Sequence, residues 1–149
     1  MSNQNADIGE LLQAYLAASP KIRNLVGNRI TPDIFEEGEP FPAIRYEVLT
    51  SFEQHHLGGS SGYAFSRVQF DCAALTRNQA NEVGFAVADV LDGFSGHVGE
   101  GSLVRVDDCV LDNKYNRRDQ PPKGSTAWRY VRVLDFEISH TQPTPTLLP

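Results

Sequence analysis

The chain has 149 residues, of which 40% are hydrophobic and 21% are charged, as expected for one globular domain. Its 13 Lys and Arg against 19 Asp and Glu give a formal charge of −6, which argues against a protein whose main task is to grip a nucleic-acid backbone. No apolar run approaches the roughly 20 residues of a membrane-spanning helix, so we expect a soluble protein made in a cytoplasm.

The N-terminal segment predicts an amphipathic helix over residues 7–18. Apolar residues recur there at helical spacing, with Asp7 in the N-cap position and Glu10 three residues later. Pro20 breaks this helix, one more short turn follows, and Gly27 stops that turn.

The next part of the chain predicts a β-hairpin with a long tip. Residues 29–31 form a short extended piece, and residues 43–49 alternate as a strand that begins after two prolines. Residues 51–62 contain QHHLGGSSG, a composition typical of a mobile loop. Residues 63–75 predict a second strand, antiparallel to the first.

Thr76 begins the best-defined helix of the chain. Thr76 and Gln79 stand in capping-box positions, an apolar stripe follows, and Gly93 or Gly96 ends the helix. We expect the apolar stripe to lie across the sheet.

The C-terminal part predicts two strand regions separated by a charged loop. Residues 102–112 are strand-like, with a bulge or turn at Asp107-Asp108. Residues 114–125 predict a mobile loop. Residues 127–139 form the longest alternating run, which suggests a central or near-central strand.

The element order predicts an α+β fold, namely a mostly antiparallel sheet with two main helices packed on it and long polar loops. We expect a single domain over residues 1–140. Residues 141–149 contain three prolines and predict an extended C-terminal tail.

Four stretches carry a family resemblance through their order and spacing. They are LVGNRITPD, PFPAIRYEV, RVQFDCAALTRNQANEVGFAVADVL and WRYVRVLDFEIS, and the pattern spans residues 8–139. This pattern resembles the tail-completion family of long-tailed bacteriophages, also called tail terminator or head-tail joining proteins. The family's strand before the helix ends in an Asp, matched by Asp71, and its helix ends in Leu-x-Gly, matched by Leu91 and Gly93. The tail after residue 140 departs from the pattern.

The resemblance implies a virion structural protein of the tail or neck, assembled in the host cytoplasm. Such proteins form a ring, commonly hexameric, that terminates the tail tube and joins the tail to the head connector. The implied partners are further copies of the chain, the tail tube protein, the connector proteins and the DNA that passes through the ring. The alternative is a small monomeric ligand-binding or adaptor domain of bacterial origin.

The candidate contact residues lie in the predicted polar segments. Three interpretations of the basic cluster remain open: a solvated loop, a contact with an acidic patch on an adjacent subunit, or a contact with DNA in a channel. The candidates are the acidic Glu36, Glu37 and Glu39, the histidines His55 and His56, and the basic Lys114, Arg117, Arg118 and Lys123.

The polar residues do not form a recognisable metal site or catalytic site. The histidines lack the spacing of zinc ligands, and no Ser, Cys or His stands at catalytic spacing from the aspartates near residue 107. We therefore expect no metal, no cofactor and no enzyme activity. Cys72 and Cys109 predict two free thiols packed as small hydrophobic residues.

Overall fold

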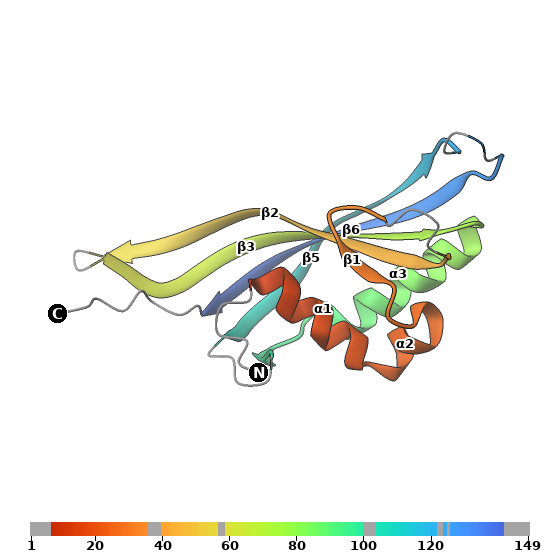
Figure 1. The fold of residues 1–149 in the computed structure, drawn as a ribbon. Coiled ribbons are helices and arrows are strands. Elements are labelled where there is room, and N and C mark those ends of the chain that lie inside the picture. The colour runs from red at the N-terminus through yellow and green to blue at the C-terminus, as the bar shows by residue number, and fades with distance from the viewer. Residues whose placement is uncertain are drawn as a thin grey trace.

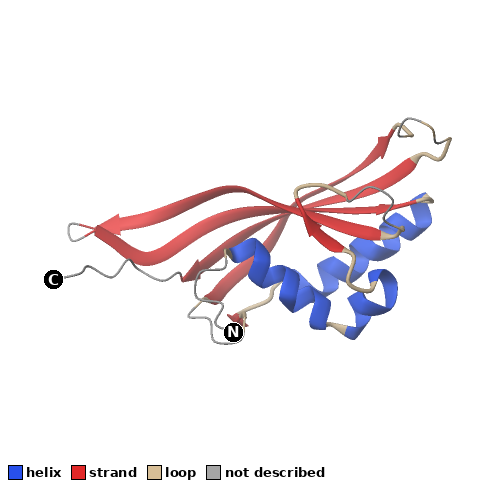
Figure 2. Cartoon of the chain, viewed as in Figure 1, coloured by secondary structure: helices blue, strands red, loops and turns tan. Residues whose placement is uncertain are grey.

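The computed structural model describes residues 7–35, 40–56, 59–99, 104–121, 124 and 126–141. These residues form three helices that lie against one face of a six-stranded sheet (Figures 1 and 2). In chain order the elements are α1 (Ile8–Ala18), α2 (Pro20–Val26), β1 (Ile30–Pro32), β2 (Ala43–His56), β3 (Gly59–Ala74), α3 (Arg77–Leu91), β4 (Gly96–His97), β5 (Arg105–Asp119) and β6 (Arg129–Thr141).

The sheet has the strand order β1-β2-β3-β6-β5-β4. β1 pairs in parallel with β2, whereas the other four pairings are antiparallel. The α+β class is therefore as predicted, but the sheet is mixed, and α2 is a helix in its own right beside the two that were expected. β6 lies at the centre beside β3, as its long alternating run predicted.

Local capping sets where the helices begin. The Asp7 carboxylate accepts a hydrogen bond from the Glu10 amide at 2.8 Å, and the Thr76 hydroxyl accepts one from the Gln79 amide at 3.2 Å. Each bond satisfies an amide that has no partner within its helix. Pro20 occupies the first turn of α2, and Gly27, with a φ of 61°, ends it.

The main hydrophobic core lies between the helices and the sheet. Leucines of α1 and the apolar stripe of α3 pack there against Phe70 and Phe136, whose ring centroids are 5.8 Å apart. Cys72 and Cys109 are free thiols buried in this core, as predicted. Burial raises the pKa of both thiols, that of Cys109 to about 12, so they stay protonated.

The β2–β3 hairpin is longer than the sequence predicted. β2 and β3 continue through residues 51–56 and 59–62, which had been interpreted as a loop, and Phe52 lies opposite Phe65. The hairpin extends well past the helices at one end of the molecule (Figure 1). The loop prediction was wrong because backbone hydrogen bonds between paired strands do not require the alternating apolar side chains that mark a strand in a sequence.

β5 is also longer than expected. It pairs with β6 without interruption from Asn113 to Asp119, so the predicted charged loop was wrong for residues 114–119. The predicted bulge is present as a register shift between Val106 and Asp108, and a second shift lies between Leu111 and Asn113. Its partner β6 continues to Thr141, one residue beyond the expected end of the domain.

Candidate functional site

The face of the sheet that the helices leave uncovered is rich in charged side chains. We call it the open face, and the opposite side the helix side. Because residues alternate between the two faces along a strand, the pairing register places Arg45, Asp71 and Tyr115 on the open face. The same alternation places the core residues Ile44, Phe70 and Leu134 on the helix side, where the core contains them.

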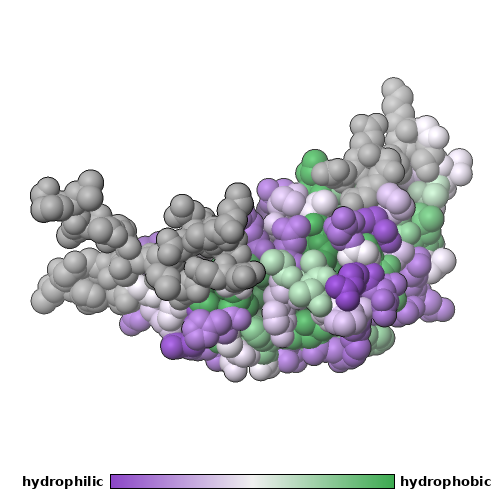
Figure 3. All heavy atoms as spheres, turned by 60° about the horizontal axis from the view of Figure 1, so that its bottom comes forward, coloured by the Kyte–Doolittle hydropathy of each residue, from purple (hydrophilic) through white to green (hydrophobic). Residues whose placement is uncertain are grey.

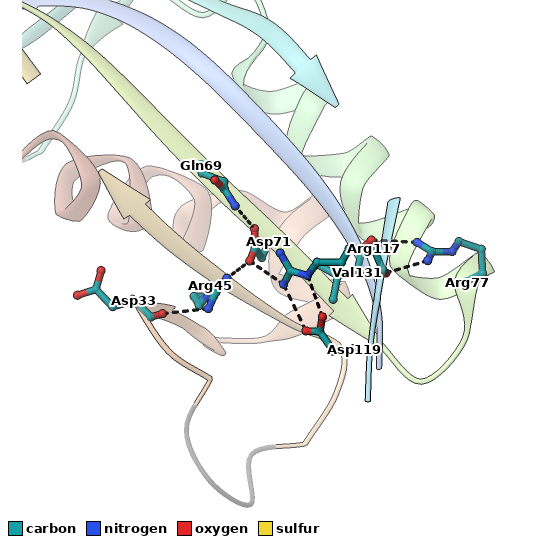
Figure 4. A network of polar contacts seen from close by, with 8 residues as sticks. All are labelled: Asp33, Arg45, Gln69, Asp71, Arg77, Arg117, Asp119 and Val131. Carbon is teal, nitrogen blue, oxygen red and sulfur yellow. Dashed lines mark hydrogen bonds and ion pairs between the residues drawn. The ribbon is translucent and has the colours of Figure 1, made fainter. Parts of the chain in front are cut away.

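Asp71 is the centre of a polar network on the open face (Figure 4). Its side chain is 1% exposed and forms an ion pair with Arg45 of β2. Arg117 of β5 donates to the same carboxylate at 3.2 Å, and Gln69 donates to its other oxygen at 2.8 Å. Burial of a carboxylate costs free energy unless charged and polar partners surround it, as they do here. These contacts link β3 to its neighbour β2 and to β5, which lies beyond β6.

Arg117 is held from several sides. Its Nε donates to Asp119 at 2.8 Å, in addition to its contact with Asp71. Arg77, from the start of α3, donates to the backbone oxygens of Arg117 and Val131, each at 2.9 Å (Figure 4). The guanidinium of Arg117 is therefore held in place by contacts within its own chain, and its role as a contact residue stays a prediction.

A second group of charges lies further along the open face. Arg67 donates to Glu137 at 2.7 Å and also pairs with Asp112. One carboxylate oxygen of Asp135 is buried and has no hydrogen-bond partner among the described residues. Burial raises the pKa of Asp135, with contributions from nearby Asp71 and Asp112, while Arg67 opposes the change.

Two exposed aromatic side chains interrupt this polar face near the long hairpin. Phe52 and Phe65 lie opposite each other on β2 and β3, with exposed fractions of 69% and 45%. The ring of Tyr63 packs edge-on against Phe65 at a centroid distance of 5.5 Å. A hollow of about 290 Å³ lies beside the pair, lined in part by Thr50 and Arg67. Exposed aromatic residues next to a hollow are typical of a contact surface.

The helix side contains a buried polar pair at the base of the same hairpin. Ser66 Oγ lies 2.7 Å from His140 Nε2, and both residues are 4% exposed. A serine hydroxyl within hydrogen-bond distance of a histidine nitrogen is also the arrangement of a nucleophile and its general base. These two side chains, however, are shielded from solvent. Where Figure 3 shows described residues on the helix side, hydrophilic and hydrophobic residues are interspersed.

The predicted basic cluster is divided between the two faces of β5. Arg117 lies on the open face opposite Val131, whereas Lys114 and Arg118 lie on the helix side opposite Leu134 and Tyr130. The Arg118 guanidinium stacks 4.5 Å above the Trp128 ring. The three residues therefore do not form one basic patch, and Lys123 is outside the described residues.

The other predicted contact residues are only partly described. The backbones of His55 and His56 pair with Ser60 and Gly59 at the end of the long hairpin. Glu36, Glu37 and Glu39 are outside the described residues.

Within the part of the chain that the structure describes, no three His, Cys, Asp or Glu side chains gather as metal ligands would. None of the described helices has the length and apolar character needed to cross a membrane.

Sequence reasoning missed the Asp71 network and the exposed aromatic pair. The ion pairs join residues far apart in the chain, and the sequence contains no signal for their pairing. The aromatic pair did leave a signal, because the alternation that puts Arg67 and Asp71 on the polar face also puts Phe65 there.

Comparison with known proteins decides the family. A family model described as tail completion protein gp17 matches residues 10–138, which is nearly the whole described fold. The chain belongs to this family. Members of the tail completion family are structural proteins of phage tails, so this chain is a virion tail component. The family resemblance expected from the sequence is thereby confirmed.

The fold also has a counterpart among solved structures. A chain from a structure titled "Virion of native gene transfer agent (GTA) particle" matches with a TM-score of 0.61 and 14% identity. The match covers 92% of this chain and 97% of the other, so the two share a fold over almost their entire lengths. No match was found among curated protein sequences.

Proposed function

We propose that this tail completion protein is a subunit of a ring of six copies that sits on the head-proximal end of the tail tube. The ring stops tube growth and presents a surface to the head connector. DNA passes through its centre without being bound specifically. The observation that carries this proposal is the family match over residues 10–138.

The shape of the subunit supports the proposal. A ring subunit must contact a neighbour on each of two sides. The outermost strands of the sheet, β1 and β4, are short and pair with only part of the long strands β2 and β5 beside them. The β2–β3 hairpin also extends beyond the helices, which gives the subunit reach toward another protein (Figure 1). The exposed Phe52–Phe65 pair lies on that hairpin and supplies apolar contact area.

The charge of the chain also supports the proposal. A formal charge of −6 suits a ring through which DNA must move, because cationic walls would retain a polyanion. On the open face, the arginines near Asp71 and Asp112 are paired with carboxylates within the same chain. Such neutralised arginines attract phosphate less than unpaired ones would.

The proposal is tested by assembling particles without the protein. We expect tails of irregular length and heads that stay unattached, both measured by negative-stain electron microscopy. Addition of the purified protein to such tails and heads should restore head attachment. Tails of normal, uniform length that still join heads in its absence would contradict the proposed function.

A further inference from the structure

The sheet has two long outer edges that the described strands leave largely unpaired. β1 pairs with β2 only at Ile44–Tyr46, so no described strand pairs with the outer edge of β2 from Glu47 to Glu53. At the other side, β4 pairs with β5 only at Arg105 and Val106. The turn after α3 then covers the next part of β5, where Gly93 N donates to Cys109 O and Leu111 N donates to Asp92.

From Asp112 to Asp119, no described strand pairs with the outer edge of β5. Open edges carry unpaired backbone N–H and C=O groups and readily accept another strand. Natural sheets usually keep such edges short, bulged or covered. Two long open edges on opposite sides of one sheet are therefore best explained by a partner for each.

We propose that β5 of one copy pairs with β2 of the next copy, so that the sheet continues from subunit to subunit. This inference rests on the proposed ring. β2, β3, β6 and β5 run alternately antiparallel, so β5 and the next β2 are antiparallel when neighbouring subunits keep the same orientation. Contact between two different edges is a head-to-tail interaction, which generates a closed ring when the rotation from copy to copy closes.

The exposed side chains select one register for this pairing. Phe52 and Tyr115 are both on the open face, with exposed fractions of 69% and 42%. Placing them opposite each other also places Glu53 opposite Lys114 on the helix side. Neither Glu53 nor Lys114 forms an ion pair with a described residue of its own chain. An aromatic pair and an opposite-charge pair are both favourable across an antiparallel ladder.

Neighbouring registers are worse. A shift of one residue puts every facing pair on opposite sides of the sheet. A shift of two residues in one direction places Phe52 opposite the polar Asn113, so the aromatic pair is lost, and it also separates Glu53 from Lys114. A shift of two in the other direction places Phe52 opposite Arg117, whose guanidinium is already held by Asp71 and Asp119.

Disulfide trapping tests the register directly. The double variant Phe52→Cys/Tyr115→Cys should form disulfides between copies on mild oxidation and give a covalent ladder on a non-reducing denaturing gel. A disulfide within one copy is excluded, because β3 and β6 separate the two strands by roughly 14 Å, and a disulfide needs Cα atoms within about 7 Å. The native cysteines are buried and do not interfere.

The matched control is Phe52→Cys/Asn113→Cys. It keeps Phe52→Cys and moves the second cysteine two residues along the same face and edge of β5, which is out of the proposed register. It should cross-link far less than the first variant under identical oxidation.

A charge swap tests the pairing without cysteines. Glu53→Lys and Lys114→Glu should each raise the protein concentration needed for half-maximal ring assembly by about threefold or more, as expected for a like-charge cross-strand pair. The double variant should return assembly toward the wild-type concentration. Assembly is measured by light scattering, and thermal unfolding checks that each variant is folded.

The outcomes separate this inference from the proposed function. If rings form but Phe52→Cys/Tyr115→Cys does not cross-link above the control, or if the charge swap gives no recovery, then the β5–β2 pairing is wrong while the ring stands. If no closed ring forms in solution or on tail tubes, both proposals are overturned.

Discussion

At the residue scale, Asp71 is central to the open face. Its carboxylate is almost fully shielded from solvent, and the two arginines that contact it come from different strands. Because these arginines are one quarter to one third exposed, water screens them more than it screens Asp71. Both arginines contact the same buried carboxylate, so loss of Asp71 removes both ion pairs at once.

Replacing Asp71 by Asn should lower the free energy of unfolding by about 2 kcal/mol, since the buried site loses its charge and two charge-assisted hydrogen bonds. Urea denaturation measures the loss. The matched control is Glu137→Gln, which removes a carboxylate from the more exposed pair with Arg67 and should cost less than about 1 kcal/mol. Equal stability of the Asp71 variant and wild type would show that the network contributes nothing.

His140 links stability to pH. Its Nδ1 lies 2.9 Å from the carbonyl oxygen of Thr141, so Nδ1 carries the proton and Nε2 accepts from the Ser66 hydroxyl. Burial lowers the pKa of His140 below its ordinary value, and the bond to Thr141 only partly opposes this change. Between the two pKa values, the unfolded chain therefore binds more protons at this position than the folded chain does.

The stability that neutral His140 contributes is present above the unfolded pKa, which is about 6.5, and is lost as the pH falls through the lower folded value. Wild type should therefore lose more unfolding free energy between pH 7 and pH 5 than the His140→Gln variant. Urea denaturation at both pH values measures the difference. Parallel losses in the two proteins would mean that His140 does not titrate during unfolding.

At the element scale, the helices were easier to predict than the ends of the strands. Asp7 and Thr76 are followed by their capping partners within three residues, so the sequence contains the whole signal for each helix start. Residues 51–54 of β2 and most of residues 114–119 of β5 are exposed, so they lack the alternation of buried and exposed positions that marks a strand. The serines, glycines and charges in the extensions of β2, β3 and β5 resemble those of a loop, and only pairing with distant strands makes these segments extended.

The contact between α1 and β2 depends on a glycine. A Cβ atom at Gly9 would lie 2.9 Å from Val48 Cγ2 and 3.0 Å from Tyr46 Cε2. Tyr46 is 4% exposed, and its hydroxyl donates to Gln13 at 2.8 Å, so its ring has little freedom to move. The helix can lie this close to the sheet because residue 9 has no side chain.

Gly9→Ala should therefore destabilise the protein, although alanine is the better helix former. Overpacking costs about 1–3 kcal/mol, against a helix-propensity gain of at most about 1 kcal/mol. The expected net loss is about 1 kcal/mol, measured by thermal or urea unfolding. The control Asn78→Ala, at an exposed position of α3, should be neutral or stabilising. An increase in stability for Gly9→Ala would show that α1 can shift away from β2.

At the scale of the whole molecule, the family pattern was accessible from the sequence and the interaction surface was not. The order of segments that ends in the strand around Phe136 predicted the family, which the match over residues 10–138 confirms. The candidate contacts were chosen from local charge, and the fold then separated Arg117 from Lys114 and Arg118. Such a division depends on strand pairing, which composition does not specify.

We expect copies of this tail completion protein to form a closed ring at one end of the tail tube. Electron cryomicroscopy of tails assembled with the purified protein would make this arrangement visible. The expected result is a closed ring at the head-proximal end, with β5 of each copy beside β2 of the next. Single copies scattered along the tube, or a tube end without a ring, would contradict it.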